Sequence, residues 1–217
     1  MKEQIKLTKT DYQAINNDDS NYINNKGAVL YTKDTYYKSV EYYRLASAMG
    51  DVQATSNLGY CYLYGRDIEV NLDLAIAYFT IAAKKGNADA AYKLGDIYGS
   101  DKWELKDKEL SVYYYRMAAS FLIDDEWTPY NTYYNDELKR YPSLCFALAR
   151  ELGKDGSMPT DLFLSFIFLN IAKEGYEKEL MNGSDMYQDV YEKVLALLDD
   201  EQYNEVREDY INLTQEG

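Results

Sequence analysis

The residue types that enzymes use most for proton transfer are unevenly represented in this chain. Its 217 residues include no histidine, two cysteines, and 37 aspartates and glutamates. Without histidine, neither a Ser-His-Asp triad nor a Cys-His pair can activate a nucleophile. Zinc and iron sites that need imidazole ligands are excluded for the same reason. The side chains left for chemistry are carboxylates, lysines and tyrosines.

Paired carboxylates can hydrolyse a substrate when they lie about 5–10 Å apart in a cleft. The acids here are spread along the chain, and no spacing distinguishes one pair from the others. Cys61 and Cys145 lie among apolar residues and form no Cys-x-x-Cys motif, which is typical of small core residues. We therefore expect no enzyme, no catalytic residue, no metal and no cofactor. A carboxylate-dependent hydrolase is kept as a remote alternative.

The charge and the hydropathy pattern limit the possible partners. The net charge is −14 and the isoelectric point is about 4.5, so phosphate backbones and anionic membranes would repel the surface. The chain starts with the polar stretch MKEQIKLTKT, and its longest apolar run, 162–172, is about half the length of a membrane span. We expect a cytoplasmic protein that binds neither nucleic acid nor membranes. Its charge allows a basic protein partner.

A pattern of small and aromatic residues returns at an interval of 36 residues. Leu58-Gly59 recurs as Leu94-Gly95, and Tyr62 recurs as Tyr98. A second set recurs in three copies, namely Tyr42, Ala46 and Gly50, then Tyr78, Ala82 and Gly86, then Tyr114 and Ala118. Agreement at so many positions indicates internal repeats, which are typical of solenoid proteins.

Each repeat holds two helical patterns separated by turn residues. Apolar and small residues follow helical spacing in 52–64 and again in 72–85. Gly65 and Gly86 stand where these helices should stop. The residues that can cap the second helix are Asn71 and Asp73. The repeat is therefore predicted to be helix, turn, helix, turn.

Glycine inside a helix costs up to about 1 kcal/mol, so Gly59 and Gly95 require a packing reason. We interpret them as positions where two helices approach closely. Tyr62, Tyr78 and Phe79 are then expected to fill the space opposite Gly59, and Tyr98 the space beside Gly95.

Residues 54–90 follow the pattern A-x3-L-G-x2-Y-x2-G, then D-x-A-x2-[YW]-[YF]-x2-A-A-x2-G-x3-A, and so resemble a Sel1-like repeat. The matching residues are Ala54, Leu58, Gly59, Tyr62, Gly65, Asp73, Ala75, Tyr78, Phe79, Ala82, Ala83, Gly86 and Ala90. The resemblance implies an all-α fold, a right-handed α-solenoid of helix-turn-helix repeats related in shape to tetratricopeptide arrays. It also implies a scaffold for protein contacts.

The other copies depart from the pattern. The first keeps only the turn and the second helix, and no first helix is recognisable before it. The third has a good first helix at 88–99 but carries Asp101 in place of Gly65. A fourth, degenerate copy is expected at 142–176, with Leu148-Ala149 in place of Leu58-Gly59.

These observations predict one domain over residues 1–217. Its parts are a weakly ordered N-terminal segment (1–26), Sel1-like repeats (27–120), an insertion (121–141), the degenerate repeat (142–176) and C-terminal capping helices (177–217). The cap is expected because a solenoid end needs a polar outer face. The aromatics of the insertion, Trp127, Tyr130, Tyr133 and Tyr134, either cover a neighbouring helix or form a contact loop.

In a helix-turn-helix solenoid the first helices line the concave groove. If Leu58 and Gly59 are packing residues, helical geometry turns their neighbours toward the groove. The partner-binding candidates in the three first helices are Gln53, Ser56, Tyr60 and Leu63, then Asp89, Tyr92 and Asp96, then Phe146 and Arg150. Tyrosine suits such a surface because it offers a large area and a hydroxyl group.

The favoured function is a non-enzymatic scaffold that binds a protein or peptide through this groove. The alternative is an immunity protein or inhibitor that neutralises one basic toxin or enzyme, since an acidic inhibitor gains association rate from charge complementarity. The sequence carries no signal of oligomeric state.

Overall fold

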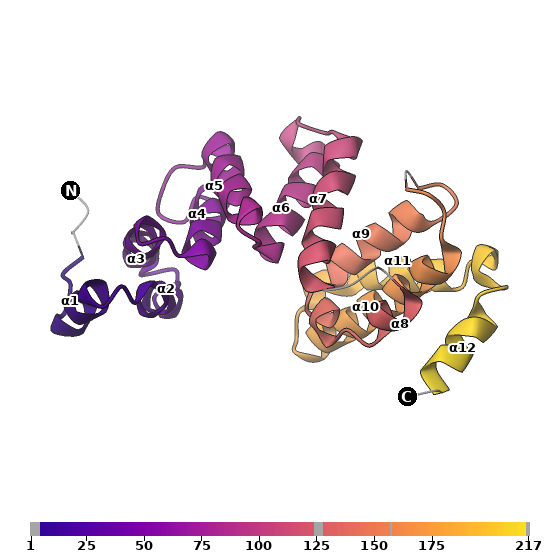
Figure 1. Cartoon of the computed structure of the whole chain (residues 1–217). Helices are drawn as coiled ribbons and strands as arrows, with labels where there is room; N and C mark the ends of the chain where they lie inside the picture. Colours follow the sequence, from indigo (N-terminus) through magenta and orange to yellow (C-terminus); the bar gives the residue numbers. More distant parts are fainter. Residues whose placement is uncertain (1–4, 124–127, 157, 216–217) are drawn as a thin grey trace. The chain divides into compact units, whose positions relative to one another are not determined.

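The computed structural model describes residues 5–123, 128–156 and 158–215, and every regular element in these ranges is helical (Figure 1). This confirms the all-α fold. The described residues form two compact units, with the boundary between Leu94 and Gly95. The prediction of a single domain over 1–217 stays a prediction.

The first unit contains α1 (Lys9–Asn16), α2 (Ser20–Val29), α3 (Tyr36–Ala48), α4 (Val52–Tyr64) and α5 (Leu72–Lys84). Helix α6 (Ala88–Gly99) crosses the boundary. The second unit continues with η1 (Asp101–Trp103), α7 (Lys108–Leu122), α8 (Pro129–Tyr133), η2 (Asp136–Arg140), α9 (Pro142–Leu152), α10 (Leu162–Met181), η3 (Asp185–Tyr187), α11 (Gln188–Leu198), η4 (Glu201–Tyr203) and α12 (Arg207–Gln215).

Asparagine and aspartate side chains begin the helices of the repeats in one way. Each accepts a hydrogen bond from the backbone N–H three residues later, which satisfies a donor that the first helical turn leaves unpaired. The residues that do so are Asp51, Asn71, Asn87, Asp107 and Asp161, at 2.7–3.0 Å. Asn71, rather than Asp73, is thus the cap of α5. Gly65 ends α4 in the left-handed conformation, as its position predicted.

Gly59 and Gly95 do mark close approaches between the two helices of a repeat. A Cβ atom at Gly59 would lie 2.7 Å from the Phe79 ring, and one at Gly95 would overlap the Tyr115 ring. The space is therefore filled by an aromatic residue 20 positions downstream. The expectation is confirmed for Phe79 and is wrong for Tyr62 and Tyr98.

Those two tyrosines stack instead on the second helix of their own repeat. The Tyr62 ring lies 5.4 Å from that of Tyr78, with 7° between the planes, and Tyr98 lies 5.8 Å from Tyr114 at 8°. Offset aromatic pairs of this kind add to the energy gained from burial alone. Each repeat thus joins its helices by one close glycine–aromatic contact and one tyrosine stack.

The first repeat does have a first helix, α2, which corrects the sequence interpretation. A Cβ atom at Gly27 would lie 2.8 Å from the Tyr43 ring, as at Gly59 and Phe79. The Ser39 hydroxyl donates to the Gly27 carbonyl at 2.7 Å. Gly27 therefore takes the place of Gly59, and the leucine before it is replaced by Lys26. A lysine at a core position hid the apolar pattern.

Lys26 of α2 binds α1, which lies in the segment that was expected to be weakly ordered. Its Nζ donates to the fully buried Asp11 carboxylate at 2.6 Å. The Tyr42 hydroxyl donates to the same carboxylate at 3.0 Å, and the Thr8 N–H at 2.7 Å. Burial alone would raise the pKa of Asp11. The hydrogen bonds from Lys26, Thr8 and Tyr42 together have the larger, opposite effect, and they lower the pKa from 3.8 to about 2. Residues 9–29 thus form two helices, and the second is fixed to the first by an ion pair between the half-buried Lys26 and the buried Asp11.

Helices α9 and α10 have the contacts of a repeat. The Ser165 hydroxyl donates to the Ala149 carbonyl at 2.7 Å, just as Ser111 donates to the Gly95 carbonyl at 2.8 Å. The backbone N–H of Asp161 donates to the Leu152 carbonyl at 3.0 Å, and the equivalent bonds at Asn71 and Asp107 measure 3.0 and 2.9 Å. This register is the one predicted for the degenerate copy at 142–176.

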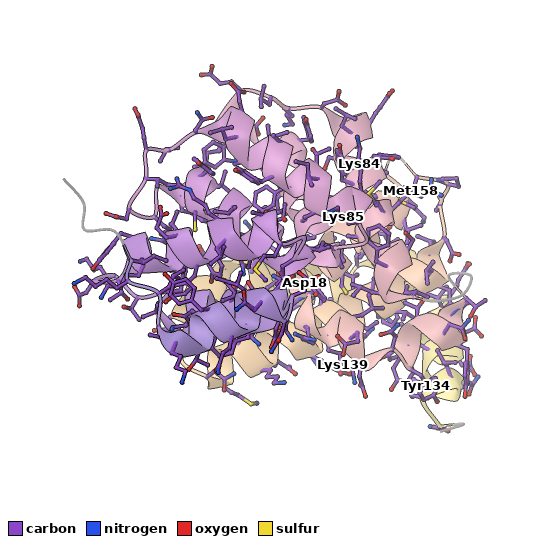
Figure 2. The ribbon with its side chains drawn as sticks, turned by 60° about the vertical axis from the view of Figure 1, so that its left-hand side comes forward. Asp18, Lys84, Lys85, Tyr134, Lys139 and Met158 are labelled. Atoms are coloured by element: carbon purple, nitrogen blue, oxygen red, sulfur yellow. The ribbon has the colours of Figure 1, made fainter. Side chains whose placement is uncertain are left out.

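The C-terminal helices and the insertion pack on α10. Phe166 of α10 contacts Tyr203 and Tyr210, with ring centroids 5.3 Å apart in both pairs. Tyr133 of the insertion contacts Tyr210 at 5.7 Å, and the Tyr134 hydroxyl donates to the Leu213 carbonyl at 3.1 Å; Figure 2 shows Tyr134 beside the last helix. Trp127 lies outside the described residues. Tyr133 and Tyr134 thus contact the last helix, whereas Tyr130 is 59% exposed, and the choice between the two roles of the insertion stays a prediction.

Candidate interaction surface

A chain of hydrogen-bonded carboxamides crosses the first helices of the first unit. Asn57 of α4 donates to Asn24 of α2 at 3.0 Å, and Gln53 donates to Asn57 at 3.3 Å. Asn87, the cap of α6, donates to Gln53 at 2.9 Å. The chain thus joins three successive first helices by neutral polar groups. Gln53 is exposed and Asn57 and Asn87 are half-buried, so the chain faces solvent on one side.

Tyr60 and Tyr92, both predicted groove residues, lie around one lysine. The Lys93 Nζ lies 5.8 Å from the centroid of the Tyr60 ring and 4.9 Å from that of Tyr92. Both distances are within the range in which a cation is attracted to a ring face. Tyr60 also stacks on Tyr64 at 6.2 Å and meets Phe79 edge-on at 5.0 Å. Gln53 is exposed and the other members are half-buried, and we call Gln53, Asn57, Tyr60, Asn87, Tyr92 and Lys93 the first-helix surface.

The predicted groove residues of the second unit lie around Tyr115. Its hydroxyl donates to Asp96 at 3.0 Å. Burial raises the pKa of Tyr115, the Asp96 carboxylate raises it further, and the nearby Arg150 guanidinium lowers it. The Arg150 guanidinium lies 5.9 Å from the centroid of the Phe146 ring. Asp96, Phe146 and Arg150 therefore occupy one neighbourhood of the second unit.

Ser56 and Leu63 do not reach the surface, although the sequence predicted that they would. Ser56 is fully buried and Leu63 is 3% exposed. Helix α4 packs against both α3 and α5, so the buried part of its circumference is wider than the single stripe assumed from Leu58 and Gly59. Asp89, in the first turn of α6, remains half-buried.

The described residues hold no group of three or more histidine, cysteine, aspartate or glutamate side chains that could bind a metal. Cys61 and Cys145 are both buried, and burial raises the pKa of the Cys61 thiol to about 12. A thiol with such a pKa stays protonated at neutral pH and is a poor nucleophile. Within the described ranges, no helix is long and apolar enough to cross a membrane.

One face of α7 lines an open pocket of about 1130 Å³ in the second unit. The lining residues are Lys108, Glu109, Val112, Tyr113, Arg116, Met117, Ser120 and Phe121. They are mixed in charge and come from a single helix, so they bring no set of catalytic groups together.

Comparison with known families identifies the repeats. The Sel1 repeat model matches residues 22–51, 52–87 and 88–120. The chain contains three Sel1 repeats. The first match includes most of α2, which agrees with the complete first repeat seen in the structure.

Two solved structures resemble this chain. The crystal structure of a Sel1 repeat protein from Oxalobacter formigenes matches 94% of this chain and 78% of that one, with a TM-score of 0.55 and 17% identity. The structure of c5321, a protective antigen present in uropathogenic Escherichia coli strains and displaying an SLR fold, gives a TM-score of 0.48 over 91% and 48% of the two chains, at 17% identity. At 17% identity, the match to the Oxalobacter formigenes protein shows a shared fold alone.

A curated relative matches part of the repeats. DAP3-binding cell death enhancer 1 of Rattus norvegicus is 34% identical over 73 residues, which are 32% of this chain and 14% of that protein. The chain thus corresponds to about a seventh of that relative. Sel1 repeat proteins generally mediate protein–protein interactions, and the fold is typically a non-enzymatic scaffold.

The sequence reasoning missed Asn57, Asn87 and Lys93. Asn24, Asn57 and Asn87 stand at different positions of their repeats, three, two and eight residues before Gly27, Gly59 and Gly95, so no recurring signal points to them. Asparagine is also a turn and capping residue, and Asn87 does cap α6 while its amide group donates to Gln53. The Asn87 side chain therefore both caps α6 and belongs to the carboxamide chain.

Proposed function

We propose that this chain is a non-enzymatic scaffold that binds a protein or peptide partner through the first-helix surface of its Sel1 repeats. The observation that carries the proposal is the carboxamide chain beside the Tyr60–Lys93–Tyr92 group. In the second unit the proposal includes Asp96, Phe146 and Arg150.

The chemistry of the first-helix surface supports this role. A carboxamide has two N–H donors and two acceptor lone pairs, and the hydrogen bonds that link Gln53 and Asn57 into the chain use one donor and one acceptor lone pair of each. Tyrosine adds a large contact area at a low cost in conformational entropy. The name of the rat relative describes that protein as DAP3-binding, which supports a binding role.

The inhibitor alternative is supported by the charge distribution. Residues 1–94 contain 11 basic and 11 acidic residues, whereas residues 95–217 contain 12 basic and 26 acidic ones. The whole net charge of −14 therefore belongs to the second unit. An inhibitor of a basic enzyme would bind through the second unit and would lose association rate steeply as salt increases.

The two roles are separated by affinity capture from a native lysate at low and high salt, read by mass spectrometry. A Tyr60→Ala/Lys93→Ala variant is compared with the wild-type chain and with Tyr12→Ala, which removes an exposed tyrosine of α1. We expect the double variant to recover at least about tenfold less of the partner than the wild-type chain, as for the loss of an interface hot spot. Tyr12→Ala should recover as much of the partner as the wild-type chain.

If the double variant retains the partner, and the partner is lost at high salt, the result would contradict binding through the first-helix surface and would favour the inhibitor. Equal loss by Tyr12→Ala would also contradict it, because the effect would not then be specific to the first-helix surface.

A further inference from the structure

The loop between α4 and α5 places a guanidinium group among three tyrosine rings. The Arg66 guanidinium carbon lies 5.1 Å from the centroid of Tyr36, 5.6 Å from that of Tyr64 and 6.0 Å from that of Tyr31. Its Nε also donates to the Tyr31 hydroxyl at 3.1 Å. The rings come from three places, namely the α2–α3 link, the start of α3 and the end of α4. We call Tyr31, Tyr36 and Tyr64 the tyrosine cage.

The cage holds its cation without help from an acid. Among the described residues Arg66 takes part in no salt bridge, although the first unit contains 11 acidic residues. The ring faces supply the attraction, and Tyr31 supplies one acceptor. Arginine suits such a site better than lysine, since its planar guanidinium is weakly hydrated and stacks on aromatic faces.

The main chain of the loop is held by bonds that do not involve the Arg66 side chain. The loop is fixed by main-chain bonds, from Arg66 N–H to the Cys61 carbonyl at 3.0 Å and from Asn71 N–H to the Tyr62 carbonyl at 3.0 Å. The rings are held independently of Arg66, because Tyr31 packs against Tyr36 at 4.9 Å and Tyr64 stacks on Tyr60 at 6.2 Å. The cage would therefore keep its shape with another occupant.

We propose that the tyrosine cage is a binding site for an arginine side chain of a protein partner, and that Arg66 occupies it in the free chain. The site goes beyond the first-helix surface, which it adjoins through the Tyr60–Tyr64 stack. The Tyr31 hydroxyl sets the preference, because a guanidinium can donate to it whereas a quaternary ammonium cannot. Arg66 acts as an internal competitor at high effective concentration.

The first test uses the wild-type chain and N-acetyl-arginine amide as the probe. The Nε–H resonance of Arg66 is followed by ¹⁵N NMR, with N-acetyl-citrulline amide as the uncharged probe of the same shape. We expect the arginine probe to shift this resonance toward the position of a solvated arginine and the citrulline probe to leave it in place. Equal shifts with both probes, or none with either, would overturn the proposal.

The second test opens the cage with Arg66→Ala. Removing the internal competitor should increase the affinity for the arginine probe by about tenfold over wild type, and adding Tyr36→Ala should abolish the gain. Lys38→Ala is the matched control, since it removes a cation that lies over one ring only, Tyr37, at 5.5 Å. Far-UV circular dichroism checks that each variant is folded.

An Arg66→Ala chain that binds the arginine probe no better than wild type or Lys38→Ala would overturn the proposal. So would a gain that survives Tyr36→Ala. Neither result bears on Tyr60 and Lys93, so failure of the cage is distinguishable from failure of the first-helix surface.

Discussion

Gly59→Ala is expected to destabilise the first unit by about 2 kcal/mol, although the same change stabilises an ordinary helix by up to about 1 kcal/mol. The reversal follows from the Phe79 ring, which lies 2.7 Å from the position of the added Cβ. Phe79 is fully buried, so its ring would have to shift within a packed core. Urea unfolding followed by circular dichroism measures the difference.

The fourth helix pair suggests how the loss can be reversed. At the positions that correspond to Gly59 and Phe79 it carries Ala149 and Leu169, both fully buried. Gly59→Ala/Phe79→Leu should therefore be more stable than the sum of its single changes predicts, with a coupling of about 1–2 kcal/mol. A Gly59→Ala chain as stable as wild type, or strictly additive single effects, would show that the close approach is not what requires glycine.

Asp11→Ala is expected to cost about 3 kcal/mol, the largest effect of a single change in the N-terminal segment. Asp11 is fully buried and accepts from Lys26, Tyr42 and Thr8, so its removal leaves three donors without their acceptor. Glu41→Ala is the control, because it breaks the exposed pair with Arg44, which should contribute no more than about 1 kcal/mol. Urea unfolding compares the two variants, and equal losses would contradict the buried role of Asp11.

The Asp11 carboxylate makes the stability of the folded chain depend on pH. Its pKa is lowered from 3.8 to about 2 in the folded chain, so its contribution is complete above about pH 4 and is lost as the pH falls toward 2. The shift corresponds to about 2 kcal/mol. The difference in stability between wild type and Asp11→Asn should shrink over this interval. A difference that stays constant from pH 5 to pH 2 would contradict the ion pair.

The repeat architecture could be predicted because it rests on contacts that recur. Small residues at fixed spacing, the Gly65 stop and the Asn71 cap are each local features of the sequence, and the structure confirms them. The register of α9 and α10 could be predicted because Leu148 and Ala149 retain enough of the pattern. Local propensity and packing agree in these segments, which makes the fold readable from the sequence.

The parts that could not be predicted depend on partners distant in the sequence. Lys26 occupies a core position only because Asp11 supplies a buried carboxylate from another helix. The burial of Ser56 depends on how many neighbours surround α4, which helical periodicity does not state. Arg66 could not be connected with Tyr31 across 35 residues, since a cation over a ring has no sequence signature.

The central claim is that a partner binds the first-helix surface, and site-specific photocrosslinking tests it most directly. Benzoylphenylalanine is placed at Gln53, which is exposed on α4, and separately at Ile81, which is 48% exposed on the second helix α5. Each chain is irradiated with the partner recovered by capture. A crosslink from position 53 and none from position 81 is the result that this account predicts. A crosslink from position 81 and none from position 53 would contradict it.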